Sequence, residues 1–123
     1  MTKTNAMTLV LQIVFWLLLL AMAVPMCFFG LTKVLRKPEK MAALAHLGYP
    51  VWFLVIVGIA EIASGVLILI PDTRWTGVAV TAVILLAAIL SHARAGDSRA
   101  QIMTPVYVFL HLMVIAVWMV AAS

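Results

Sequence analysis

The fold is decided by residues 51–70, which read VWFLVIVGIAEIASGVLILI and contain a single charged residue, Glu61. About 20 apolar residues in an α-helix are enough to cross the hydrocarbon core of a bilayer. The apolar residues follow one another without alternation, which argues against a strand of a membrane β-barrel. Residues 51–70 are therefore predicted to form a transmembrane helix.

Three more long apolar segments follow the same pattern, at residues 7–31, 75–90 and 105–122. Of the 123 residues, 67% are hydrophobic and 10% are charged, and the mean hydropathy is +1.23. A water-soluble domain of this length could not bury so much apolar surface. We predict an all-α protein with one domain, residues 1–123, folded as a four-helix transmembrane bundle.

Two features of the connecting segments refine this prediction. Residues 38–48 have the apolar spacing of a short interfacial helix. The second and fourth predicted helices begin alike, with Pro50-Val51-Trp52 and Pro105-Val106-Tyr107. Two tandem helical hairpins with the same orientation would explain this similarity, and chance among apolar residues is the alternative.

Lys and Arg are distributed unequally over the two sides of the predicted bundle. One side carries two of them, Lys3 and Arg74, and the other carries six: Lys33, Arg36, Lys37, Lys40, Arg94 and Arg99. Cytoplasmic loops carry the excess of positive charge, so both termini are predicted to lie on the non-cytoplasmic side. The net charge of +4 lies beside a membrane, so lipid, and not nucleic acid, is the expected partner.

Glu61 is the residue in the predicted spans that most strongly suggests a function. An ionisable side chain in the middle of a span must be protonated or paired, because an isolated charge there is costly. At helical spacing Glu61 shares a face with Gly58 and Gly65, and Ser64 lies beside it. The small residues on this face predict a close helix crossing. Glu61 is interpreted either as a proton or ligand site or as an interhelical hydrogen bond.

His111 is the candidate partner of Glu61, and Tyr107 lies four residues before it on the same stripe of the fourth span. A histidine whose hydrogen bonds are satisfied inside the bundle is the alternative interpretation. Lys33 and His92, at span ends, are expected to reach the lipid headgroups. The histidines have no metal-binding spacing, and no Cys/His cluster exists, so neither a metal site nor a cofactor motif is predicted.

Several motifs in order resemble the DoxX-like membrane proteins over roughly residues 10–120. They are a G-x-x-K ending of the first helix, a Gly-Tyr-Pro turn and a G-x-x-E-x-x-S-G run in the second helix. The residues that match the family pattern are Gly30, Lys33, Gly48, Pro50, Glu61 and Gly65. The resemblance implies a four-helix bundle of the bacterial inner membrane and a link to quinone-dependent oxidation.

These observations lead to three hypotheses. The first is a non-enzymatic subunit or assembly factor that binds a quinone or another lipophilic molecule near Glu61, as a homo-oligomer or in a larger membrane complex. The second is a component of a quinone-reducing oxidoreductase, in which Glu61 and His111 move protons and a partner supplies electrons. The third is proton-coupled export of a small molecule.

Overall fold

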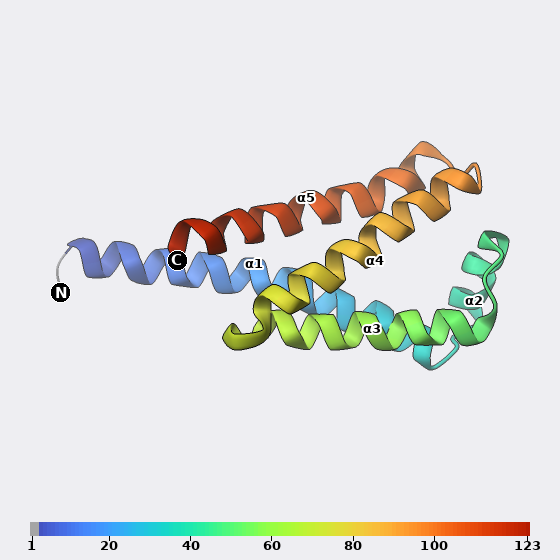
Figure 1. The fold of residues 1–123 in the computed structure, drawn as a ribbon, viewed down its shortest axis with the longest axis horizontal. Helices are drawn as coiled ribbons and strands as arrows, with labels where there is room; N and C mark the ends of the chain where they lie inside the picture. Colours follow the sequence, from blue (N-terminus) through green and yellow to red (C-terminus); the bar gives the residue numbers. More distant parts are fainter. Residues whose placement is uncertain (1–2) are drawn as a thin grey trace.

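The computed structural model describes residues 3–123, so the first two residues of the predicted domain lie outside it (Figure 1). Within this range the chain is helical and contains no strand. The elements in order are α1 (Lys3–Val34), α2 (Pro38–Leu44), η1 (Ala45–Leu47), α3 (Val51–Leu69), η2 (Pro71–Thr73), α4 (Arg74–Arg94) and α5 (Arg99–Ala122). The predicted all-α fold is confirmed, and α2 with η1 is the short helix expected between the first two spans.

The helices α1, α3, α4 and α5 are each long and apolar enough to cross a membrane. They make the chain an integral membrane protein whose apolar outer faces contact lipid. The last helix begins earlier than the predicted span, because Ser98 and Gln101 form a capping box at its N-terminus. Pro105, predicted to start this span, lies inside the helix instead.

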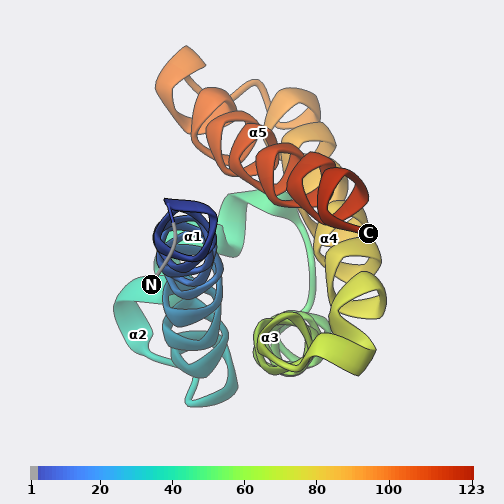
Figure 2. The ribbon, with the colours of Figure 1, turned by 90° about the vertical axis from the view of Figure 1, so that its left-hand side faces the viewer.

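Seen along its length, the bundle has its four long helices around a common axis (Figure 2). Each helix packs on the next, α1 on α3, α3 on α4 and α4 on α5, whereas α1 and α5 touch over a shorter length. The side chains at the centre are apolar: Leu19, Met22, Met26, Ile68, Val78, Leu112 and Ile115. This packing is that of the predicted four-helix bundle, in which α3 contacts α4 as extensively as α4 contacts α5.

Glycines bring α1 and α3 into backbone contact. A Cβ atom added to Gly30 would lie 2.5 Å from the carbonyl oxygen of Gly58, and one added to Gly58 would lie 2.6 Å from that of Gly30. Gly65 is buried two helical turns after Gly58, where an added Cβ would lie 2.8 Å from the sulfur of Cys27. The close crossing predicted on the Glu61 face of α3 is confirmed.

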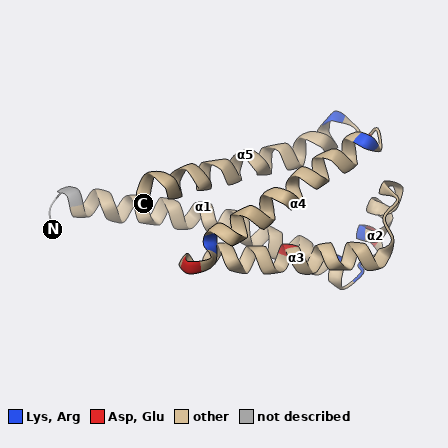
Figure 3. Cartoon of the chain, in the orientation of Figure 1, with Lys and Arg blue, Asp and Glu red and all other residues tan. Residues whose placement is uncertain are grey.

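The turn between α3 and α4 is closed by side chains that bind the free carbonyls at the end of α3. Arg74 donates from Nε to the carbonyl of Ile68 at 2.7 Å, and Thr73 donates to that of Leu67 at 3.0 Å. A helix end in a bilayer needs such partners, since water does not reach unpaired carbonyls there. Arg74 therefore stabilises the α3–α4 turn, at the end of the bundle opposite the one that carries most of the Lys and Arg residues (Figure 3).

Candidate functional site

Glu61 is paired with Lys33, and this ion pair is the centre of the candidate site. The Lys33 ammonium donates to Glu61 Oε1 at 2.5 Å, and their side chains are 12% and 11% exposed. The prediction that Glu61 must be neutralised or partnered is met by a cation at the end of α1. Two expectations were wrong: His111 does not bond to Glu61, and Lys33 turns into the bundle rather than toward the headgroups.

The two glycines explain how Lys33 and Glu61 meet. The helices α1 and α3 run antiparallel, so Gly58 lies against the Cβ of Lys33 and Gly30 lies against the Cβ of Glu61. Each charged residue follows its own helix's glycine by three positions, one turn along. The G-x-x-K of α1 and the G-x-x-E of α3 therefore form one reciprocal unit, in which each glycine makes room for the partner's charged side chain.

A cavity of about 450 Å³ extends from this ion pair between α1, α4 and α5. Most of its lining is apolar and comes from residues such as Met22, Met26, Leu85 and Val108. Polar groups also line it, namely Lys33, Lys40, Glu61, His92, Thr104 and His111. Glu61 and His111 thus belong to one cavity although they make no bond to each other.

The four predicted site residues occupy different environments. His111 is half-buried and donates from Nε2 to the carbonyl of Leu18 at 3.0 Å, which is the satisfied-histidine arrangement. Ser64 is buried and donates to the carbonyls of Ala60 and Glu61, away from the cavity lining. Tyr107 is exposed on the outer face of α5. The structure therefore brings Glu61 and His111 together and leaves the other two outside the cavity.

Lys40 is a cavity residue that the sequence did not single out, because it reads as part of a basic run beside the membrane. It lies on α2, with its ammonium 4.9 Å from the ring centre of Phe29. Burial, and then the positive charge of Lys33, lower the pKa of Lys40, while Glu61 opposes this shift. Lys33 and Lys40 both line this end of the cavity, and within residues 3–123 Lys33 is the one that forms an ion pair with Glu61.

The remaining family-pattern positions shape the turn that leads into α3. Gly48 ends η1 with φ of +84°, a left-handed conformation that glycine adopts without strain. Pro50 precedes the first residue of α3 as its N-cap. These two residues set where α3 begins, and so which turn of α3 carries Glu61.

Comparison with known proteins agrees with the motifs. No curated protein and no solved structure matches the chain. A family model described as the DoxX-like family matches residues 17–117. The match covers α3 and α4 whole and most of α1 and α5, and it includes Gly30, Lys33, Gly48, Pro50, Glu61 and Gly65. This chain, an integral membrane four-helix bundle, therefore belongs to the DoxX-like family.

Proposed function

We propose that this protein binds a lipophilic molecule with a polar head, such as a quinone, in the cavity beside the Lys33–Glu61 pair. In this proposal it serves as a non-enzymatic subunit or assembly factor of the bacterial inner membrane. The observation that carries the proposal is one cavity whose walls are mostly apolar and which contains a buried ion pair. Ligand sites typically combine such apolar walls with a few placed polar groups.

The size and position of the cavity support a ring-shaped head. A volume of about 450 Å³ lies in the range of known small-molecule sites, roughly 300 to 1,000 Å³. A larger groove of about 760 Å³ between α1 and α5 has aliphatic walls and Trp118, but no carboxylate, ammonium or imidazole. That groove suits an acyl chain, whereas the smaller cavity also offers donors for an oxygen of the head.

The charges at the cavity end favour a ligand that accepts hydrogen bonds. Lys33 and Lys40 are donors with no acceptor capacity, and a quinone presents carbonyl oxygens. Glu61 already accepts one hydrogen bond from the Lys33 ammonium and so holds it in place. The ammonium has further N–H groups that can donate to a ligand oxygen. Sulfur-rich and aromatic walls at Met22, Met26 and Phe29 suit a flat ring.

A redox role is the second candidate, because Glu61 and His111 line the same cavity. Reduction of a quinone to a quinol takes two electrons and two protons. In this alternative the carboxylate and the imidazole would pass protons to the two oxygens, and a partner protein would supply both electrons. Binding without partner proteins, but no turnover, is expected under either candidate.

The ligand proposal can be tested by filling the cavity. Ala88 lines it, whereas Ala87 is the adjacent α4 residue and faces outward. Protein purified in mild detergent should retain a quinone detectable by mass spectrometry. Ala88→Phe should retain about tenfold less or lower still, because an aromatic ring that fills the cavity should cost the ligand about 1.4 kcal/mol or more, and 1.4 kcal/mol is a factor of ten. Ala87→Phe is the matched control and should retain as much as the unchanged protein; equal retention by both variants would refute the cavity as the site.

The proposed orientation has its own test. With six Lys and Arg against two, the α1–α3 and α4–α5 connections are expected in the cytoplasm and both termini outside. A fluorescent protein that matures only in the cytoplasm should stay dark when fused to Ser123. The same reporter fused after Gly96 should be bright. The opposite pattern would invert the bundle without changing its four spans.

A further inference from the structure

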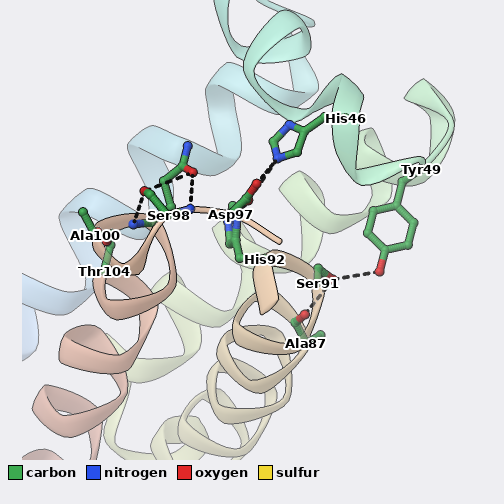
Figure 4. Close-up of polar contacts among 10 residues, drawn as sticks. His46, Tyr49, Ala87, Ser91, His92, Asp97, Ser98, Ala100 and Thr104 are labelled. Atoms are coloured by element: carbon green, nitrogen blue, oxygen red, sulfur yellow. Dashed lines mark hydrogen bonds and ion pairs between the residues drawn. The ribbon is translucent and has the colours of Figure 1, made fainter. Parts of the chain in front are cut away.

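Three side chains of metal-binding types meet at the basic end of the bundle, and one of them, His92, also lines the cavity beside the Lys33–Glu61 pair. They are His46 in η1, His92 in the last turn of α4 and Asp97 in the α4–α5 connection. Their ligand atoms all lie within 4.8 Å of one another. Figure 4 shows the Asp97 carboxylate facing the His46 ring, with His92 next to it.

In this cluster the Asp97 carboxylate contacts one ring nitrogen of each histidine. His46 Nε2 lies 2.7 Å from Asp97 Oδ1 and 2.9 Å from Oδ2, and His92 Nδ1 contacts Oδ2. Across residues 3–123, Asp97 forms its ion pairs with these two histidines and with no Lys or Arg. Hydrogen bonds, first from His46 and then from His92, hold the pKa of Asp97 below its usual value. Each imidazole therefore already presents a ring nitrogen to this carboxylate.

The backbone holds two of the three ligands rigidly. Gly96, with φ of +71°, ends α4 in a Schellman motif: its N–H donates to the carbonyl of Ala93, and that of Asp97 to the carbonyl of His92. The next residue, Ser98, is the N-cap of α5. Asp97 is thus fixed between the end of one helix and the start of the next, directly beside His92.

We infer that His46, His92 and Asp97 form a binding site for a divalent cation of the zinc type. Two imidazoles and one carboxylate are a ligand set of zinc sites that keep a fourth position open for water. Zinc bonds of about 2.0 to 2.1 Å in tetrahedral geometry separate neighbouring ligand atoms by roughly 3.3 Å. The contacts of His46 Nε2 with the Asp97 carboxylate, at 2.7 and 2.9 Å, would lengthen toward this spacing, so the ion would take the place of the present hydrogen bonds.

The exposure of the three side chains fits an ion that arrives from water. The carboxylate of Asp97 is 8% exposed and His92 is 20% exposed, while His46 is 42% exposed and forms the outer side of the cluster. A hard cation such as Mg²⁺ prefers an all-oxygen set with several waters, whereas imidazoles favour zinc. The bound ion would tie η1, which leads into α3, to the α4–α5 connection.

The test uses zinc chloride and the full-length protein, purified with a tag that contains no histidine and stripped with EDTA. Calorimetric titration should give one zinc per chain, and zinc should raise the melting temperature in detergent. Asp97→Asn keeps the shape of the side chain but should weaken binding by about a hundredfold or more, since it removes an anionic ligand. His46→Gln, at a largely exposed position, should weaken binding comparably and abolish the rise in melting temperature.

Asp72→Asn is the matched control, because Asp72 is an exposed carboxylate on η2 at the opposite end of the bundle. It should bind zinc like the unchanged protein. Two results would overturn the inference: no binding by the stripped protein, or binding that both Asp97→Asn and His46→Gln leave intact. The cluster would then be a hydrogen-bonded link between η1 and the α4–α5 connection only.

Discussion

Replacing either member of the Lys33–Glu61 pair by Met is expected to lower the free energy of unfolding in detergent by about 3 kcal/mol. Both side chains are almost fully buried, so each single variant leaves an ammonium or a carboxylate without its partner. The group that remains must either stay charged without water or a partner, or change its protonation state and become neutral. Both processes destabilise the folded state. Unfolding by a denaturing detergent, followed by circular dichroism, measures the loss.

The double variant Lys33→Met/Glu61→Met is expected to be more stable than either single variant. An apolar pair of similar volume replaces a buried ion pair with little net change, because the attraction between the charges is offset by their dehydration. Glu39→Met, at an exposed position on α2, is the control and should change stability by no more than about 0.5 kcal/mol. Losses that simply add in the double variant would show that the two groups are not coupled.

The same variants separate folding from ligand binding. A folded double variant that no longer retains a quinone would support a role of the pair in holding the head of the ligand. A folded double variant with full retention would limit the pair to joining α1 and α3, and the proposed ligand site would have to rely on other cavity residues.

Gly58→Ala is expected to cause the second large loss of stability, about 3 kcal/mol. The added Cβ would lie 2.6 Å from the backbone oxygen of Gly30, and a backbone atom cannot move aside without separating the helices. In a helix free of contacts the same change would stabilise, because alanine has the higher helix propensity. A net loss of stability in Gly58→Ala therefore reports the close contact between α1 and α3.

Two comparisons make this prediction specific. Gly65→Ala should cost less, because its closest neighbour is the sulfur of Cys27 at 2.8 Å, a side-chain atom that can shift. Ala63→Val enlarges a lipid-facing position of α3 and should have little effect. Thermal unfolding of the three variants in one detergent gives the order, and a Gly58→Ala protein as stable as Ala63→Val would contradict the close crossing.

The spans could be predicted because hydropathy reports directly on the bilayer. The ends of α4 and α5 could not, since their last and first turns are polar: the capping box at Ser98 starts α5 before its apolar stretch begins. Glu61 stood out from its type and depth alone. Its partner did not stand out, because the choice between Lys33 and His111 depends on the register of α1 against α3. The matching G-x-x-K and G-x-x-E spacings were the only signal in the sequence for that register.

The cluster at the basic end was beyond sequence reasoning for a different reason. Metal motifs are recognised when their ligands are close together in one segment. His46 comes from η1, whereas His92 and Asp97 flank a helix end far along the chain. The three meet only when the turn before α3 and the α4–α5 connection reach the same end of the bundle.

The reciprocal contact of α1 and α3 also bears on how the chain enters the bilayer during synthesis. The helices that carry Lys33 and Glu61 leave the ribosome one after the other, and a short connection joins them. A lone carboxylate in the middle of a span opposes release into lipid. Here its counter-charge is supplied by the helix made just before it, so the hairpin can leave the translocon as one neutralised unit before α4 and α5 exist.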